Sequence, residues 1–260
     1  MAVRGITKVR NEAHIIEDTL DNWAQWCDAG IHVYCDDCTD RGSTATICKG
    51  HDAVVEVIES DLYDTDRERA EWFHRRQVLH SALRFCNDDD WIVYFDGDEH
   101  LEQFDAGLLN DPETKAIACE SYDTYITPED EEHSLWHYDK REWVSQEYEF
   151  SPYFYRASLP LDFWKPDQRN MDLPKGVGFA LHGKVRHWGK GLSVEHWDQK
   201  CDYYAEIFGP KYAAKWASRR GNAVKEDMKS DFGFPLVKWE DVLSGKAGGE
   251  HCRNRMKLVR

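Results

Sequence analysis

The sequence predicts an α/β protein in which a mainly parallel central sheet is flanked by helices. Two observations support this fold class. Short β-branched or aromatic runs alternate with helical patterns through residues 1–102, and polar or acidic residues follow the ends of these runs. Such alternation is typical of β-α-β units, whose ligand crevice lies beyond the carboxyl ends of the strands. With 260 residues the chain is long enough to bury a sizeable core.

The elements of the first half follow from periodicity and from residues that begin or end helices. Ile16, Leu20 and Trp23 fall near helical spacing, and Gly30 ends that helix. Ser43 is suited to cap the next helix, because its hydroxyl can accept a bond from a free backbone N–H. In chain order we expect a strand at 4–9, a helix from 11 or 12 to before Gly30, a strand at 31–35, a helix at 43–49, a strand at 53–58, a helix at 67–85 and a strand at 91–96.

The second half is less regular. Residues 122–150 are rich in aromatic and acidic side chains and show no clear period. Gly209-Pro210 separates two helical patterns. The expected elements are a strand at 116–119, a strand at 153–156, a loop at 163–174, short strands at 177–181 and 184–188 around His182-Gly183, helices at 193–208 and 211–219, and a helix at 235–243.

Two carboxylates, Asp96 and Asp98, stand at the end of the apolar and aromatic run that begins at Trp91. On an extended strand, residues of equal parity point the same way, so both side chains can face one ligand. Oxygen ligands suit Mg²⁺ or Mn²⁺, and Mg²⁺ prefers one or two carboxylates together with substrate phosphates. The pattern therefore predicts a cation site for nucleotide-sugar chemistry. A polar turn at a strand end is the alternative, since Asp-Gly is a common turn dipeptide.

Other polar residues also follow predicted strands. Asn11 comes after the first strand, and Asp36 and Asp37 come after the second. Because the carboxyl ends of parallel strands meet at one edge of a sheet, we expect these side chains to share a crevice with Asp96. The two adjacent acids could instead serve to cap their own loop.

The composition excludes some classes of partner and site. A formal net charge of −16 opposes non-specific binding to nucleic acid or anionic membrane. The eight cysteines are scattered, and Cys35 and Cys38 have no second C-x-x-C pair to complete a zinc site. The sequence has neither a long apolar run nor a signal-peptide pattern. We therefore expect a soluble cytoplasmic protein without a transmembrane segment.

Four segments together resemble a known enzyme family. They are Val9–Glu12 after the first strand, Asp36-Asp37 after the second, Arg75–Gln77 on the helix before the acidic strand, and Phe95–Glu99 with its D-x-D-E pattern. The sequence resembles glycosyltransferase family 2, with the GT-A fold, and in particular its single-domain lipopolysaccharide-core glucosyltransferase-like branch. The resemblance covers about residues 3–102 and thins beyond them.

The resemblance implies a metal-dependent glycosyltransferase that moves a sugar from a nucleoside-diphosphate sugar to an acceptor hydroxyl. It implies a GT-A catalytic domain at 1–192, with a nucleotide-sugar half at 1–102 and an acceptor half at 103–192, followed by a helical extension at 193–260. Mn²⁺ or Mg²⁺ is the implied cofactor. The implied nucleotide-sugar contacts are Val9, Asn11, Asp36, Asp37, Arg76, Asp96 and Gly97, and the implied metal ligands are Asp96, Asp98 and His187.

The individual roles follow from the same resemblance. Asp36 or Asp37 takes the base edge, Arg76 lies near the diphosphate, and Asp98 ligates the cation. Arg76 could instead pair with neighbouring acids on its own helix. His187 could instead be an ordinary hydrogen-bonded histidine, because two other histidines lie near it in the sequence.

An inverting transfer also needs a carboxylate to accept the acceptor's proton. We expect Asp172 to be this base, with Asp167 and Asp123 as alternatives. The aromatic segment at 122–164 suits stacking against a glycan, a lipid-linked sugar or a small-molecule acceptor. The acidic charge disfavours a nucleic-acid acceptor.

Two other functions stay open at this point. A nucleotidyltransferase also presents strand-end acids to a nucleotide and a metal ion, but the sequence has no Gly-rich phosphate loop after the first strand. A non-catalytic carbohydrate-binding protein could use the aromatic segment at 122–164 without a metal ion.

Overall fold

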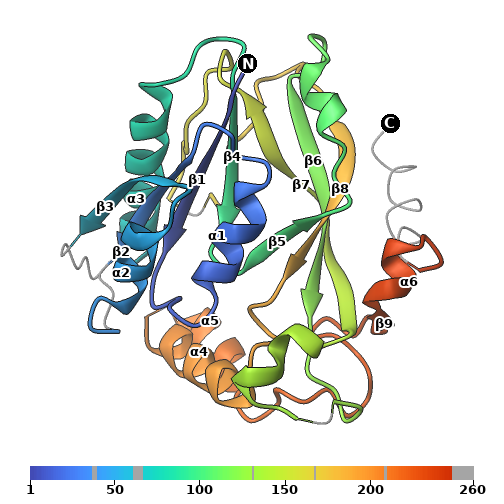
Figure 1. Ribbon diagram of the computed structural model, residues 1–260. Helices are drawn as coiled ribbons and strands as arrows, with labels where there is room; N and C mark the ends of the chain where they lie inside the picture. Colours follow the sequence, from blue (N-terminus) through green and yellow to red (C-terminus); the bar gives the residue numbers. More distant parts are fainter. Residues whose placement is uncertain (37–39, 61–66, 131, 167, 208–209, 248–260) are drawn as a thin grey trace. The chain divides into compact units, whose positions relative to one another are not determined.

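The computed structural model describes residues 1–36, 40–60, 67–130, 132–166, 168–207 and 210–247 (Figure 1). The chain divides into two compact units. Unit 1 comprises Met1–Cys119 and Phe150–Gly183, and unit 2 comprises Glu120–Glu149 and Lys184–Arg260. Both units are therefore discontinuous in sequence. The expected division into halves at 102 and an extension from 193 stays a prediction.

Four parallel strands form the N-terminal part of the sheet in unit 1. They are β1 (Val3–Val9), β2 (Ile31–Asp36), β3 (Val54–Ser60) and β4 (Trp91–Asp96), in the spatial order β3-β2-β1-β4. Adjacent strands are parallel throughout this part. The expected mainly parallel α/β fold is confirmed by these pairings. The strands β1, β2 and β4 are mainly buried, as expected where helices cover both faces of a sheet, whereas the edge strand β3 is partly exposed.

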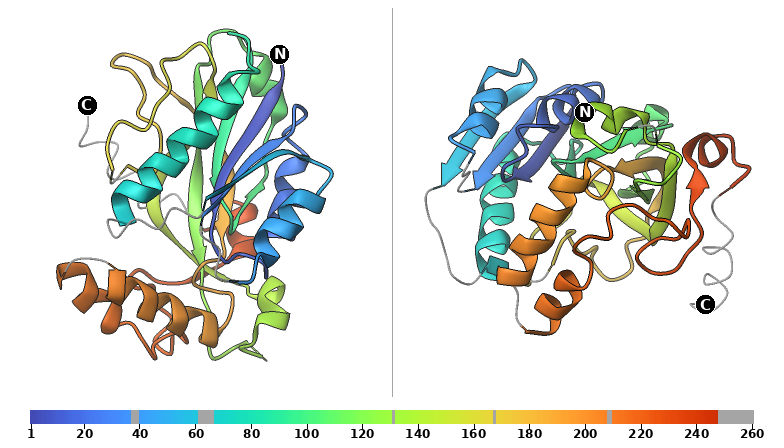
Figure 2. Two further views of the ribbon diagram at one scale, coloured as in Figure 1. Left: turned by 90° about the vertical axis from the view of Figure 1, so that its left-hand side faces the viewer. Right: turned by 90° about the horizontal axis from the view of Figure 1, so that it is seen from below.

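The helices of unit 1 cover the two faces of these strands (Figures 1 and 2). Side chains of α3 (Arg67–Leu83) pack with Tyr34 and Tyr94 in one buried cluster. On the opposite face, Trp23 of α1 (Ile16–Ala24) stacks on Phe95, with ring centroids 4.5 Å apart. Alternation along the strand therefore directs neighbouring residues of β4 to different helices. The helix α2 (Ser43–Gly50) lies against α1 and β3.

The remaining strands extend the sheet. They follow β4 in the order β7, β6, β8 and β5, and β7 is antiparallel to β4. Each of β6, β7 and β8 contributes residues to both units. Their bounds are Glu99–Glu102 for β5, Ala116–Thr124 for β6, Trp143–Arg156 for β7 and Ala180–His187 for β8, and the 3₁₀ helix η1 spans Ala106–Asn110.

Unit 2 contains short helices around two small apolar clusters. Trp239 and Val242 pack with Tyr122 and Val144 in one cluster, and Trp197 packs with buried neighbours in the other. The strand β9 pairs antiparallel with β7. The helices of unit 2 and this strand have the following bounds: η2 (Leu135–Lys140), α4 (Val194–Ile207), α5 (Pro210–Ala217), β9 (Val237–Lys238) and α6 (Trp239–Leu243).

Several expected elements differ from the structure. The two short strands expected around His182-Gly183 are one strand, β8, which passes through Gly183 at φ +91°. A Cβ there would lie within 3.3 Å of side chains of Leu101, Phe104 and Cys119, so a glycine allows the strand to continue. The segment without clear period contains the start of β7 at Trp143. The helix expected at 235–243 is the strand β9 followed by the short helix α6.

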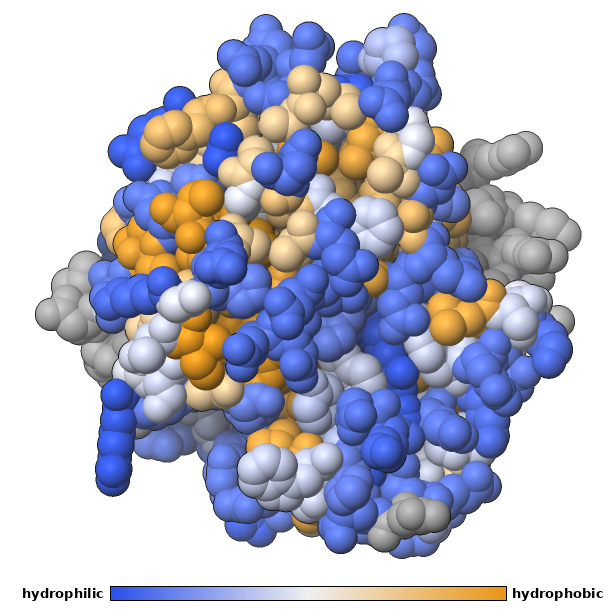
Figure 3. Space-filling model, viewed as in Figure 1, coloured by the Kyte–Doolittle hydropathy of each residue, from blue (hydrophilic) through white to orange (hydrophobic). Residues whose placement is uncertain are grey.

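The surface carries both polar and apolar side chains. Hydrophilic side chains predominate on the face shown in Figure 3, with smaller hydrophobic areas between them. Exposed aromatic side chains include Trp136, which is 89% accessible, and Trp164, which is 59% accessible. Within the described residues, no helix combines the length and the apolar character needed to cross a membrane.

Candidate functional site

Acidic residues end two strands that flank β1 in unit 1. Asp36 is the last residue of β2, and Asp96 is the last residue of β4. In the register of the sheet, Lys8 of β1 lies opposite Tyr34 on one side and Asp96 on the other. The predicted gathering of polar residues at the carboxyl edge of the parallel strands is therefore present in unit 1.

Asp36 is completely buried beside two basic side chains. Its Oδ2 lies 3.3 Å from Nζ of Lys8, and its Oδ1 lies 3.3 Å from Nδ1 of His74. The His74 ring stacks on Tyr34 with centroids 4.4 Å apart. Lys8 Nζ also lies 3.4 Å from Oε1 of Glu71 on α3. Because a buried carboxylate needs opposite charge nearby, this arrangement fixes Asp36 at the strand end.

Asp96 is held from the same face of the sheet. The Tyr94 hydroxyl donates to Asp96 Oδ1 at 3.0 Å, and Nε of Arg75 donates to the Tyr94 oxygen at 2.9 Å. Arg75 is also paired with Oε2 of Glu71, at 3.2 Å. Burial and the Asp96 charge raise the pKa of Tyr94, so its hydroxyl stays protonated and continues to donate.

These contacts make one continuous chain between the two strand-end acids. It runs from Asp36 through Lys8 and Glu71 to Arg75, and then through Tyr94 to Asp96. The first four members alternate between acidic and basic groups, so each charge has an opposite charge beside it, and the neutral Tyr94 hydroxyl joins Arg75 to Asp96. We refer to this chain as the strand-end network.

The residues after Asp96 form a turn. The strand β4 ends at Asp96, and Gly97-Asp98 leads into β5. The expectation that Asp96 and Asp98 lie on one extended strand is therefore wrong, because Asp98 lies in the turn, and the expectation that both carboxylates face one ligand stays a prediction. Asp98 is nevertheless only 6% accessible. The segment is therefore a polar turn, as the alternative interpretation of the sequence expected, and it carries a buried carboxylate at the edge of the sheet.

Two neighbouring residues brace this turn. A carboxylate oxygen of Glu99 accepts from the backbone N–H of Asp96 at 3.0 Å, and the other accepts from the Tyr153 hydroxyl at 3.0 Å. A Cβ on Gly97 would lie 2.8 Å from Cγ1 of Val9. The absence of a side chain at residue 97 is therefore what allows the turn to approach the end of β1.

Asn11 connects the ends of the first two strands. Its φ of 55° lies in the left-handed region, which asparagine tolerates better than most residues. Its side-chain oxygen accepts from the backbone N–H of Asp40 at 3.2 Å. Val9, two residues before it, is buried. Asp37, the other acid expected to contact the base, lies outside the described residues.

Arg76 lies in a different environment from Arg75. Its Nε and one terminal nitrogen each lie 2.8 Å from an oxygen of Asp162, which is a bidentate ion pair. Asp162 is buried and also accepts from the backbone N–H of Phe163 at 2.8 Å. The expected contact of Arg76 with a diphosphate stays a prediction, and the partner in the structure is not one of the neighbouring helical acids.

Asp172, the expected base, is exposed in the irregular segment that follows β7. The nearby Tyr155 is buried, and its hydroxyl contacts the carbonyl of Met171 at 3.2 Å. Burial and, to a smaller extent, the Asp172 charge raise the pKa of Tyr155. Asp167, one alternative base, lies outside the described residues.

The second group of polar residues lies in unit 2. His187 is bonded through Nδ1 to Oδ1 of Asp123, and Asp123 Oδ2 lies 2.8 Å from Nζ of Lys190. A carboxylate on one ring nitrogen orients an imidazole that binds metal through the other. A metal ion at His187 would therefore use Nε2. Asp123, the other alternative base, is occupied by these two partners.

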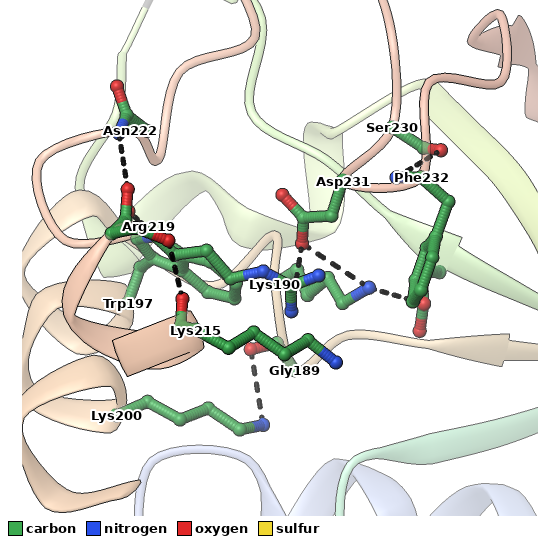
Figure 4. Close-up of polar contacts among 12 residues, drawn as sticks. Gly189, Lys190, Trp197, Lys200, Lys215, Arg219, Asn222, Ser230, Asp231 and Phe232 are labelled. Carbon is green, nitrogen blue, oxygen red and sulfur yellow. Dashed lines mark hydrogen bonds and ion pairs between the residues drawn. The ribbon is translucent and has the colours of Figure 1, made fainter. Parts of the chain in front are cut away.

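Lys190 also belongs to a cluster around Asp231 (Figure 4). Asp231 is buried between Lys190, Arg219 and Lys225, whose nitrogens lie 3.5, 3.7 and 2.6 Å from its carboxylate oxygens. Lys190 and Arg219 also lie over the Phe232 ring, each 5.4 Å from its centroid. The cluster joins the strand end of β8 to the segment after α5 within unit 2.

Asp96 and Asp98 are the acidic residues that bear on the predicted cation site. Among the described residues, no three His, Cys, Asp or Glu side chains are grouped closely enough to hold a metal ion by themselves. Mg²⁺ typically keeps several waters and binds one or two carboxylates together with substrate phosphates. Asp96 and Asp98 carry carboxylate oxygens, the donor type that Mg²⁺ prefers, and their role as metal ligands stays a prediction.

Sequence reasoning missed four members of the strand-end network. Lys8, Glu71, Arg75 and Tyr94 were not among the candidates, although all four are polar groups in contact with one another. Tyr94 carried a usable signal, because it stands two residues before Asp96 and therefore shares its face of the strand. The others come from β1 and α3, and only the folded arrangement brings them to the site.

Comparisons with known proteins give weak likenesses. No protein-family model and no curated protein matches the sequence. The structure is similar to S. aureus TarS 1–349, with a TM-score of 0.41, 11% identity and coverage of 83% of this chain and 69% of that one. It is also similar to glucosyl-3-phosphoglycerate synthase from Mycobacterium tuberculosis in complex with Mn²⁺, uridine diphosphate (UDP) and phosphoglyceric acid. There the TM-score is 0.31, the identity is 16%, and the coverage is 46% of this chain and 43% of that one.

A third likeness is to the galactosyltransferase LgtC in complex with donor and acceptor sugar analogues, with a TM-score of 0.30 and 12% identity. It covers 60% of this chain and 58% of that one. This chain spans 43% of the longer S. aureus TarS chain. At TM-scores below 0.5, these likenesses assign neither a substrate nor residue roles to this chain.

Proposed function

We propose that this protein is a metal-dependent glycosyltransferase that uses a nucleoside-diphosphate sugar at the carboxyl edge of the parallel strands of unit 1. The strand-end network is the observation that carries this proposal. It fixes Asp36 at the end of β2 and Asp96 at the end of β4, on either side of β1. Fixed acids on the ends of the two strands that flank β1 suit a ligand that has both a nucleoside and a cation-bound diphosphate.

The donor would be bound by residues from three strand ends. Asp36 or Asp37 would contact the base, and the backbone near Val9 and Asn11 would line the nucleotide. Asp96 would contact the ribose or the cation, and Asp98 would ligate the cation beside Gly97. When bound, Mn²⁺ or Mg²⁺ would neutralise the charge that develops on the departing diphosphate.

Two basic residues complete the proposed set. Arg76 would contact the diphosphate while sharing its charge with Asp162, because both oxygens of that carboxylate already engage the guanidinium. His187 would be a further metal ligand through Nε2, with Asp123 orienting the ring through Nδ1.

Asp172 is our candidate for the base of an inverting reaction. Its carboxylate would take the proton from the acceptor hydroxyl while that oxygen forms a bond to the anomeric carbon. The bond from the anomeric carbon to the phosphate oxygen would break, and the nucleoside diphosphate would leave with the electron pair. The exposed position of Asp172 supports this role, since an acceptor must reach the base from solution.

The proposed acceptor is a glycan, a lipid-linked sugar or a small molecule with a free hydroxyl. The exposed indole of Trp164 in unit 1 supports a sugar acceptor, because a flat apolar surface can stack on a sugar ring. Trp136 offers a similar surface in unit 2.

The donor site can be tested by thermal unfolding with Mn²⁺ and a panel of nucleoside diphosphates. We expect one diphosphate to raise the unfolding temperature in the presence of Mn²⁺, and Asp98→Asn to abolish the shift. Asp52→Asn is a matched control, because Asp52 is an exposed acid before the opposite end of β3. It should keep the shift.

Three other outcomes would contradict the proposal. If no diphosphate stabilises the protein, the donor site is absent. Preferential stabilisation by nucleoside triphosphates, with release of pyrophosphate in a turnover assay, would indicate a nucleotidyltransferase. Binding of a glycan without metal, unchanged in Asp96→Ala and Asp98→Ala, would indicate a carbohydrate-binding protein.

A further inference from the structure

Adjacent arginines on α3 have different partners in unit 1. Arg76 engages Asp162 through two bonds of 2.8 Å. Arg75 is 7% accessible and donates through Nε to the Tyr94 hydroxyl at 2.9 Å. It is Arg75, which sequence reasoning passed over, that reaches the acidic end of β4.

We propose that Arg75 and Tyr94 are positioning residues that fix the orientation of the Asp96 carboxylate toward the cation. This inference rests on the proposed function, because it assigns these two residues to the metal site of the proposed glycosyltransferase. Neither side chain would touch the cation or the donor. Both would act through Asp96.

The direction of the hydrogen bonds follows from the chemistry of the donors. A guanidinium has N–H donors and no acceptor, so the Arg75–Tyr94 bond uses a lone pair of the Tyr94 oxygen. The single hydroxyl proton of Tyr94 is then directed to another acceptor, which is Asp96 Oδ1 at 3.0 Å. Arg75 therefore determines which way the Tyr94 proton points.

This bond selects one oxygen of Asp96 for the cation. Oδ1 accepts from Tyr94, and the backbone N–H of Asp96 is held by Glu99 at 3.0 Å. With both the backbone and Oδ1 fixed, the remaining oxygen, Oδ2, is the one that the geometry offers to a metal ion. Side chains that orient a metal ligand in this way typically contribute about 10-fold to 100-fold in metal affinity.

The strand-end network explains why Arg75 stays in place. A terminal nitrogen of Arg75 lies 3.2 Å from Oε2 of Glu71, four residues earlier on α3. The other oxygen of Glu71, Oε1, lies 3.4 Å from Nζ of Lys8. A buried guanidinium needs such a partner, because an unpaired charge in the interior is costly. The carboxylate of Glu71 thereby holds Arg75 against Tyr94.

The central test is the affinity of Tyr94→Phe for Mn²⁺, measured by electron paramagnetic resonance of the free ion, with Mn²⁺ alone and with Mn²⁺ and UDP. We expect about a 10-fold weakening or more, because the phenyl ring keeps the packing but cannot donate to Asp96.

Tyr155→Phe is the matched control. Tyr155 belongs to the same buried cluster as Tyr94, and its hydroxyl contacts the main-chain oxygens of Pro152 and Met171. This variant should lose stability to a similar extent and keep the Mn²⁺ affinity of the unmodified protein. Equal weakening in the two variants would overturn the proposal, because it would show a general effect of core stability.

A second pair of variants tests the arginine. Arg75→Met should weaken Mn²⁺ binding as Tyr94→Phe does, and Arg75→Lys should recover part of the affinity by donating again to the Tyr94 oxygen. Arg84→Met, at an exposed arginine just after the same helix, should bind Mn²⁺ normally. Normal Mn²⁺ binding by folded Arg75→Met would also overturn the proposal.

The controls separate this inference from the proposed function. If the unmodified protein binds Mn²⁺ and Asp98→Asn does not, the metal site is present, and an unchanged affinity in Tyr94→Phe refutes only the positioning role. If the unmodified protein shows no Mn²⁺ binding with or without UDP, the proposed metal site fails and the positioning role fails with it.

Discussion

Arg76 and Asp162 form a bidentate ion pair in unit 1, with both nitrogen–oxygen distances at 2.8 Å. The Arg76 side chain is one-third accessible, whereas that of Asp162 is almost buried. The pair joins α3 to the segment that follows β7. Because the carboxylate is the buried partner, loss of the guanidinium would leave a buried charge unpaired, whereas loss of the carboxylate would leave a guanidinium that water still reaches.

We therefore expect Arg76→Gln to lower the free energy of unfolding by about 1–3 kcal/mol, the usual cost of a hydrogen bond lost from a buried charged group. Urea unfolding followed by tryptophan fluorescence would measure it. Asp162→Asn and the double variant complete a thermodynamic cycle. Strictly additive effects would contradict an energetic coupling between the two residues.

Gly97→Ala should destabilise the protein and weaken the donor site. The new methyl group would lie 2.8 Å from Cγ1 of Val9, and a core that must move to admit a methyl loses about 1–3 kcal/mol. Thermal unfolding would show the loss. Val9→Ala in the same chain removes the obstructing atom, so the double variant should be less destabilised than the sum of the two single variants. A simple sum would show that the contact is unimportant.

His32 should make the protein less stable below neutral pH. Burial, opposed by its bond to Glu56, lowers the pKa of His32 from 6.5. The unfolded state then binds the proton more readily, so this stability is present above pH 6.5 and is lost as the pH falls toward the lower pKa of the folded state. The unfolding free energy should therefore decrease between about pH 7.5 and pH 5.5.

Urea unfolding of His32→Gln at both pH values is the comparison for this prediction. The variant should be less stable at either pH, but its stability should fall less between them. The pKa of Glu56 is also lowered, mainly by the hydrogen bond from Ser81. The stability that this shift contributes is lost only below pH 4.5, so it does not affect the comparison between about pH 7.5 and pH 5.5. Equal slopes for both proteins would refute the role of His32.

Asp172→Asn tests the proposed base once a donor and acceptor are known. We expect turnover to fall by about 10²-fold to 10⁴-fold, the usual contribution of a positioned general base. The diphosphate-induced shift in unfolding temperature should stay unchanged, because Asp172 is not proposed to contact the nucleotide. Asp88→Asn, at another exposed acid of unit 1, is the control. Unchanged turnover in Asp172→Asn would move the role to Asp167 or Asp123.

Much of unit 1 could be predicted from the sequence. The strands β1 to β4 and the helix α3 begin and end within a few residues of their expected bounds. Their signals are local, since periodicity and turn residues depend on near neighbours in sequence. The start of β7 and the unbroken course of β8 were missed because strand pairing far along the chain, and not a local pattern, determines them.

The candidate site divides in the same way. Apolar runs that end in Asp36 and Asp96 were visible, because a strand end is a local feature. The sequence did not show which of the two adjacent arginines, Arg75 or Arg76, reaches the acidic end of β4. Successive residues of an α-helix point about 100° apart, so one arginine contacts Tyr94 and the next contacts Asp162.

The sequence by itself determined the alternation of strands and helices and the presence of acids at the strand ends. Local periodicity and local turn chemistry are sufficient for both. Only the tertiary structure decided between a strand and a turn for Asp98, and only it joined Asp36 to Asp96 through Lys8, Glu71, Arg75 and Tyr94. These contacts join three strands, β1, β2 and β4, and the helix α3, which are far apart in the chain, and the packing of those elements determines which side chains meet.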